Sequence, residues 1–145
     1  MAKPTVNAID NRIIGITDGS AIPAGVVGEV IKSTNTTGVS PTSGTNFDCT
    51  SIALTPGTWW LYGNFYFYCA SGISNAYGWM STTSATYPSN TNVTCIPGAS
   101  TPVAANSVPS WPLTITANTT VYLSGQVNCG GAGTYYGQIF ARRSA

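Results

Sequence analysis

The chain has 145 residues, the size of a single domain, and only 6% of them are Asp, Glu, Lys or Arg, against about 25% in ordinary soluble proteins. It contains no histidine, which removes the usual general base and the commonest metal ligand. Its five Lys and Arg residues are too few for a basic groove that binds nucleic acid. No residue from Cys49 to Ala141 carries a formal charge, and so neutral a surface indicates a protein that lives in an assembly.

Residues 1–25 differ in character from the rest of the chain, and we expect them to form an extended N-terminal arm. They contain four charged residues and a few isolated apolar ones, which are Val6, Ile9, Ile13, Ile14 and Ile16. These apolar residues would dock on a neighbouring subunit or cover the edge of the chain's own sheet. The arm has no apolar run of the length that a signal peptide or membrane anchor needs, which predicts synthesis and folding in a cytosol.

From residue 26 onward the pattern predicts strands and turns, with no helix. Strands are expected at 26–33, 47–54, 59–69, 72–82, 92–96, 113–117, 120–129 and 134–142. A polar loop is expected at 35–46 and a Pro-rich loop at 97–112. Pro56 and Gly57 predict a turn that joins the second and third strands into an antiparallel hairpin. About eight short strands predict an all-β fold over residues 26–145, a jelly-roll-like antiparallel β-sandwich.

The third strand is unusually rich in aromatic residues, as its sequence TWWLYGNFYFYC shows. Side chains of a strand alternate between two faces, so one face carries Trp59, Leu61, Gly63, Phe65, Phe67 and Cys69 and is expected to pack in the core. The other carries Trp60, Tyr62, Asn64, Tyr66 and Tyr68. That second face suits three roles: a subunit interface, a sugar-stacking platform, or a second layer of the protein's own core.

The four cysteines, Cys49, Cys69, Cys95 and Cys129, allow two interpretations. In a secreted chain they would be expected to form two disulfides, for which three connectivities are possible. In a cytosolic product they are better interpreted as small buried hydrophobic residues, and Cys69 and Cys129 each continue an apolar strand face. Their spacing matches no zinc-binding pattern.

No catalytic centre is predicted. A glycosidase would need two carboxylates flanking the scissile bond, but Asp10 and Asp18 lie in the arm, and Glu29 and Asp48 lie in or at the start of strands. No cofactor or metal site is expected. The final Arg142 and Arg143 would be solvated or would bridge to acidic groups on a partner. The candidate subunit interface therefore consists of Trp60, Tyr62, Tyr66, Tyr68, Arg142 and Arg143.

Two segments resemble proteins of a known kind. Residues 50–67 fit the pattern TSIxLTxGxWxxxGNxxF, and the chain ends in TVYLSGQVNCGGAGTYYGQIFARRSA. Both are similar to small structural proteins and fibre-tip domains of tailed bacteriophages, in which the second forms a closing hairpin. The resemblance covers about residues 25–143, and residues 71–112 match only in character.

This resemblance implies a homo-oligomeric jelly-roll component of the virion. The short arm favours a capsid decoration or cement protein, made in the host cytoplasm and bound to the outer capsid surface. Its partners would be further copies of itself, as a dimer or trimer, and the major capsid protein, with no nucleic acid and no membrane. Two alternatives remain open. One is a receptor-binding tip of a tail fibre, and the other is a secreted lectin-like or adhesion domain, which disulfides would indicate.

Overall fold

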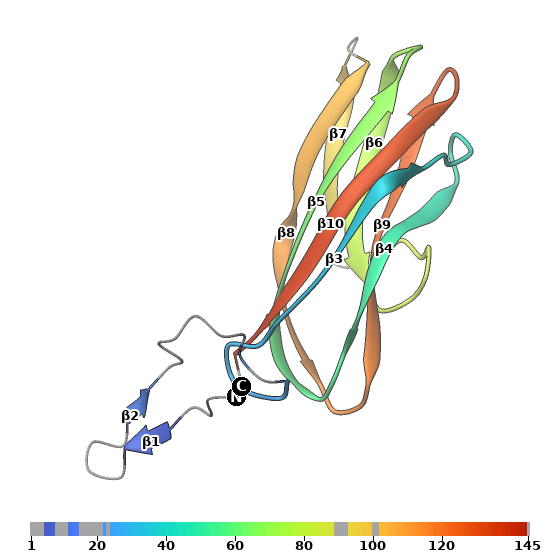
Figure 1. Ribbon diagram of the computed structural model, residues 1–145. Helices are drawn as coiled ribbons and strands as arrows, with labels where there is room; N and C mark the ends of the chain where they lie inside the picture. Colours follow the sequence, from blue (N-terminus) through green and yellow to red (C-terminus); the bar gives the residue numbers. More distant parts are fainter. Residues whose placement is uncertain are drawn as a thin grey trace.

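The computed structural model describes residues 5–7, 12–14, 22, 24–88, 93–99 and 102–144. In these ranges the chain forms strands and no helix, and two four-stranded antiparallel sheets lie face to face (Figure 1). The first, here called the β5 sheet, has the order β3 (Val30–Val39), β10 (Gly133–Arg143), β5 (Gly57–Cys69), β8 (Val103–Ile115). The second, the β9 sheet, has the order β4 (Asn46–Leu54), β9 (Thr119–Cys129), β6 (Ile73–Ser81), β7 (Val93–Ala99). This strand order is that of a jelly roll, so the predicted fold class is confirmed.

The expected N-terminal arm contains a short hairpin. β1 (Thr5–Asn7) pairs antiparallel with β2 (Arg12–Ile14) and joins neither large sheet. Three of the apolar residues singled out in the sequence lie in these strands, namely Val6, Ile13 and Ile14. The other two, Ile9 and Ile16, lie outside the described residues. Docking of the arm on a neighbouring subunit stays a prediction.

The core lies between the inner faces of the two sheets, and the predicted inner face of β5 is confirmed. Trp59, Leu61 and Phe67 are fully buried. Tyr135 of β10 lies at the centre of the aromatic packing, with its ring stacked on Phe65 at 5.4 Å, and burial raises the pKa of its phenol well above the usual value. Gly78 of β6 makes room for Phe65, because a Cβ there would lie 2.3 Å from that ring.

Two predicted loops are wrong, because both edge strands of the β5 sheet extend into them. β3 continues to Val39, through the first part of the expected polar loop, and β8 begins at Val103, inside the expected Pro-rich loop. An edge strand needs only one hydrogen-bonded neighbour, so it tolerates proline, which lacks an N–H. The β5–β8 register shifts between Leu61 and Gly63, which places Pro109 and its neighbour in a bulge.

The predicted Pro-Gly hairpin is also wrong. β4 pairs with β9, whereas β5 pairs with β10 and β8, so the turn at Pro56 and Gly57 carries the chain from one sheet to the other. The expected closing hairpin fails in the same way, because β9 and β10 belong to different sheets. In both connections the two consecutive strands lie in opposite sheets. Their apolar faces therefore meet across the core, and the strands do not pair with each other.

The cysteines divide into three kinds. Cys69 at the end of β5 and Cys129 at the end of β9 form a disulfide that links the two sheets, with their Cα atoms 6.5 Å apart. The interpretation of these two as unpaired hydrophobic residues is therefore wrong. It is correct for Cys49, which is buried and free and whose pKa desolvation raises to about 12. Cys95 is free and exposed.

Candidate binding face on the β5 sheet

The outer face of the β5 sheet is built from cross-strand rows that β5 and β10 share. The register pairs Trp60 with Arg142, Tyr62 with Phe140, Asn64 with Gln138, Tyr66 with Tyr136 and Tyr68 with Thr134. Two aromatic rows thus flank one row of amides. The rings in a row touch: Tyr62 stacks on Phe140 at 4.8 Å, and Tyr66 lies 5.9 Å from Tyr136 at an interplanar angle of 56°.

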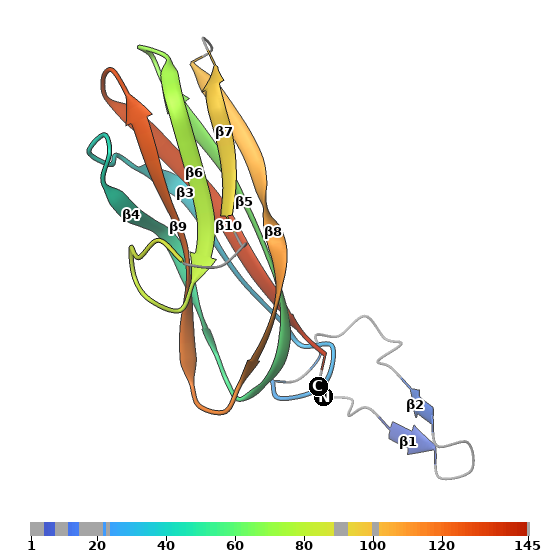
Figure 2. The ribbon, with the colours of Figure 1, turned by 180° about the vertical axis from the view of Figure 1, so that it is seen from behind.

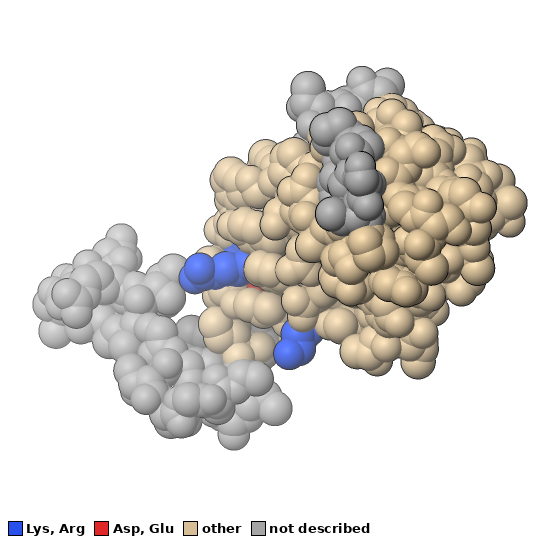
Figure 3. All heavy atoms as spheres, turned by 90° about the horizontal axis from the view of Figure 1, so that it is seen from above, with Lys and Arg blue, Asp and Glu red and all other residues tan. Residues whose placement is uncertain are grey.

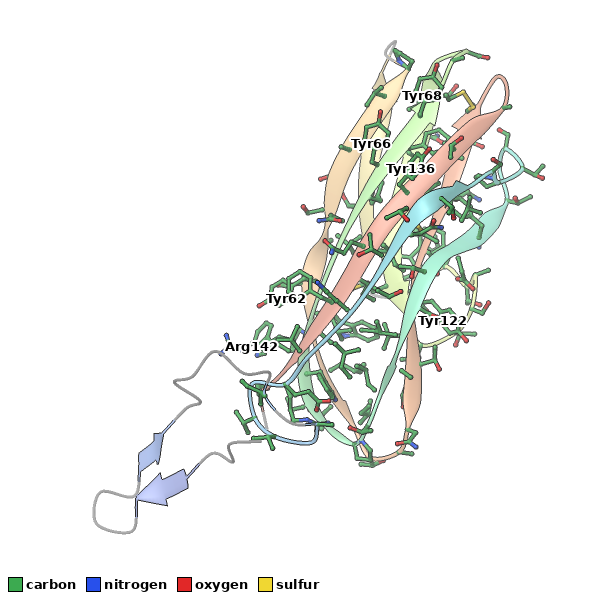
Figure 4. All side chains as sticks on the ribbon, viewed as in Figure 1. Tyr62, Tyr66, Tyr68, Tyr122, Tyr136 and Arg142 are labelled. Carbon is green, nitrogen blue, oxygen red and sulfur yellow. A yellow bond between two sulfur atoms is a disulfide. The ribbon has the colours of Figure 1, made fainter. Side chains whose placement is uncertain are left out.

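The four predicted rings of β5 are open to solvent. Trp60, Tyr62, Tyr66 and Tyr68 keep between 39% and 42% of their surface exposed. Figure 4 shows the three tyrosines on the same side of the sheet. The interpretation of this face as a second layer of the protein's own core is therefore wrong. A subunit interface and a sugar-stacking platform remain.

The lower end of this face, as oriented in Figure 4, is an aromatic and aliphatic patch with a cation beside it. We define the lower patch as Val27, Val30, Trp60, Tyr62, Phe140 and Arg142. Val27 and Val30 are among the most exposed large apolar side chains in the described ranges. A hollow of about 420 Å³ lies here, lined by Val27, Trp60, Tyr62 and the two arginines. Exposed apolar area concentrated in this way is typical of interaction sites.

The upper end holds a groove with a different lining. We call it the tyrosine groove, with a volume of about 680 Å³, and its walls include Asn64, Tyr66, Asn106, Ser107, Tyr136 and Gln138. In Figure 4, Tyr66 and Tyr136 lie side by side here, with Tyr68 above them. No charged side chain lines it. The surface viewed in Figure 3 is likewise almost free of charge.

The two terminal arginines lie in opposite environments. Arg142 is exposed at the lower patch, as expected for an interface residue. Arg143 is buried and its Nε donates to Glu29 Oε2 at 3.0 Å. Its other nitrogens donate to the carbonyl oxygen of Pro56 at 2.6 Å and to the hydroxyl of Thr55, and its guanidinium lies 4.2 Å from the centre of the Trp59 ring. The structure therefore removes Arg143 from the candidate interface; its role is to hold the turn between β4 and β5.

The two described carboxylates serve structure. Glu29 accepts from Arg143 and also from the backbone N–H of Gly25 at 2.7 Å. Asp48 accepts from the Ser84 hydroxyl at 2.5 Å, the Ala85 N–H at 2.8 Å and the Ser124 hydroxyl at 2.6 Å. Asp10 and Asp18 lie outside the described residues. In the described ranges, no three His, Cys, Asp or Glu side chains come together to hold a metal ion.

Sequence reasoning missed the contribution of β10 to this face. Tyr136, Gln138 and Phe140 complete the rows begun by β5. The signal was present, because the same period of two that separates the faces of β5 also runs through the segment TYYGQIFAR. What the period could not reveal was that this strand lies beside β5.

A scan of protein-family models and a search of curated proteins found no match to this sequence. In the part of the chain that the structure describes, no helix is long and apolar enough to cross a membrane.

Proposed function

We propose that this chain is a non-enzymatic structural protein of a virion, a capsid decoration or cement protein. It binds the outer capsid shell as a homo-oligomer and bridges neighbouring subunits of the major capsid protein. The observation that carries the proposal is the lower patch, where Trp60 and Tyr62 stand exposed on a rigid sheet. The jelly-roll fold and the resemblance of residues 50–67 to phage structural proteins also support the proposal.

The residue types of the lower patch are those that dominate protein–protein interfaces. Trp, Tyr and Arg are the usual hot-spot residues. Trp and Tyr bury a large area at a low cost in conformational entropy, and the planar guanidinium of Arg makes directed hydrogen bonds. Trp60 and Tyr62 are carried by the backbone of β5, and the Tyr62 ring is further held by its stacking on Phe140. A stable interface buries about 1,600 Å² in total, so the patch would form the centre of a contact whose rim lies beyond it.

The charges near the patch indicate the character of the partner. Lys32 of β3 and Arg142 of β10 are both exposed on the outer face of the β5 sheet. Glu29, the nearest acidic residue in sequence, is buried against Arg143. Among the described residues, the free charges on this face are therefore basic. They favour an acidic rim on the partner, which would orient the two surfaces as they meet.

The test is cosedimentation of the purified protein with capsids that lack it, scored as copies bound per capsid. We expect saturable binding at a simple ratio to the major capsid protein. Trp60→Ala should weaken it by about tenfold or more, as the loss of a hot-spot ring does, while Tyr122→Ala, on the outer face of the other sheet, should leave it unchanged. Absence of capsid binding by the wild-type chain would overturn the proposal.

Two observations favour the alternatives of a receptor-binding tail-fibre tip or a secreted lectin-like domain. The disulfide between Cys69 and Cys129 is the bond expected of a protein that works in an oxidising environment. The tyrosine groove is a concave site with convergent polar groups. Binding to host cells in place of capsids would favour the tail-fibre tip. Binding to neither capsids nor host cells would leave the secreted lectin-like domain as the remaining alternative.

A further inference from the structure

The tyrosine groove lies on the same sheet as the lower patch but offers different chemistry. Its lining includes the aromatic row of Tyr66 and Tyr136 and the neighbouring amide row of Asn64 and Gln138. Residues two apart on one strand face are separated by about 7 Å. A ring and an amide thus alternate at a spacing that one small cyclic ligand can span.

Several polar atoms in the groove are free to bind a ligand. Gln138 Nε2 donates to Thr34 Oγ1 at 3.0 Å, which fixes the amide and leaves its carbonyl oxygen without a partner among the described residues. The Asn64 amide and the Tyr66 and Tyr136 hydroxyls likewise have no hydrogen-bond partner in those ranges. Amides and phenols can both donate and accept, so the groove can satisfy a ligand that does both.

Two of the residues that line the groove, Asn106 and Tyr136, are held in place by their neighbours. Asn106 of β8 donates to Thr94 of β7 at 2.7 Å and accepts from the backbone N–H of Ser107 at 2.8 Å. The Tyr136 ring fits over Gly38, which has a φ of +80° and where a Cβ would lie 3.0 Å from the ring. A binding site whose side chains are held before the ligand arrives loses less entropy on binding.

From this arrangement we infer that the tyrosine groove binds a neutral oligosaccharide. A pyranose ring has an apolar C–H face, which stacks on tyrosine, and a rim of hydroxyls that donate and accept hydrogen bonds, which the amide row meets. No cation lines the groove to pair with a sulfate, sialate or phosphate group, and nucleic acid is disfavoured for the same reason.

This inference goes beyond capsid attachment and does not depend on it. The groove and the lower patch share no side chain among the residues that define them. One protein can therefore use Trp60 and Tyr62 against a protein partner while Tyr66 and Tyr136 remain open to a glycan.

The test is direct binding of the full-length chain to a panel of immobilised neutral oligosaccharides built from glucose, galactose, mannose and N-acetylglucosamine, with sulfated and sialylated forms beside them. We expect at least one neutral oligosaccharide to bind, and binding to fall by about tenfold in Tyr66→Ala and in Gln138→Ala. Tyr66→Phe, which keeps the ring and loses the hydroxyl, should lose less than Tyr66→Ala. Thermal melts check that each variant is folded, which we expect because these side chains lie on the surface.

The matched controls are Tyr122→Ala, a tyrosine on the other sheet, and Trp60→Ala, a ring of the lower patch; both should bind the glycan as the wild type does. Failure of every neutral oligosaccharide to bind would overturn the inference. So would a preference for the sulfated or sialylated forms, or equal losses in Tyr122→Ala and Tyr66→Ala. None of these results bears on cosedimentation with capsids, so the two proposals fail separately.

Discussion

The outer faces of the two sheets each carry a tryptophan, and the two differ in exposure: one is buried and the other is open to solvent. On the β9 sheet, seen from behind in Figure 2, Trp79 of β6 is fully buried outside the main core, with its ring 5.1 Å from that of Tyr87. Residues 82–88, which contain Tyr87, follow β6 directly, and Asp48 of β4 holds this segment through Ser84 and Ala85. On the β5 sheet, Trp60 keeps 42% of its surface exposed.

This difference shows that the fold can bury an aromatic ring on the outer face of a sheet, as it does with Trp79. The chain covers Trp79 with residues 82–88, which the half-buried Asp48 holds in place, yet no described element lies over Trp60 or its neighbours. A large ring left in water forgoes the free energy of burial, and a contiguous row of such rings indicates a surface that a partner covers. On the outer side of the β9 sheet Trp79 is therefore covered, whereas the rings on the outer side of the β5 sheet are left exposed.

The comparison is tested most severely by removing each tryptophan in turn. Trp79→Ala should lower the free energy of unfolding by about 3–5 kcal/mol, because it leaves a cavity beneath residues 82–88. Trp60→Ala should change it by no more than about 0.5 kcal/mol, as surface substitutions do. Urea unfolding of both variants measures the difference. Equal losses of unfolding free energy in the two variants would mean that Trp60 stabilises the fold as much as Trp79 does. The contrast between the two faces would then be wrong.

The next largest effect concerns the bond that holds the two sheets together. The double variant Cys69→Ala, Cys129→Ala should be less stable by about 2–4 kcal/mol, because the disulfide closes a long loop in the unfolded chain. Cys95→Ala, which alters a free and exposed thiol, is the matched control and should unfold like the wild type. A urea midpoint unchanged in the double variant would show that packing alone holds the sheets.

A smaller effect should follow from releasing the cover of Trp79. Asp48→Ala leaves three donors without their acceptor, at a cost of about 1–3 kcal/mol, and should speed amide hydrogen exchange in residues 82–88 while leaving β5 protected. Ser84→Ala removes one of the three hydrogen bonds and should have a fraction of the effect. Exchange that rises equally in both sheets would indicate global destabilisation and no specific anchor.

Local patterns predicted much of this molecule, and pairing between distant segments is where they failed. The alternation of Trp59 and Trp60 separated core from surface correctly, because a period of two is a property of one strand. Pro56 and Gly57 predicted a turn, but the same turn can join paired strands or cross between sheets, and only the rest of the fold decides. The first part of β8, residues 103–112, is predicted as a loop because prolines in a strand are tolerated only at an edge, and edge position is not visible in sequence.

The candidate site shows the same division. The exposed rings of β5 were predicted, whereas their partners on β10 were not, because the register between residues 60 and 142 depends on chain topology. Arg142 and Arg143 looked alike as a pair of terminal charges. The buried acceptor that distinguishes them, Glu29, lies more than a hundred residues away in the sequence.

The position of β10 has a consequence for how the chain is made. This last strand lies between β3 and β5, and its Arg143 closes the turn that joins β4 to β5. Until residues 133–143 have left the ribosome, β3 and β5 have no partner between them, and their unpaired backbones and exposed rings are open to other chains. Pairing within this sheet must therefore wait until β10 has been made, and contacts so distant in sequence make folding slow. A nascent chain of this protein would depend on being shielded until its final strand arrives.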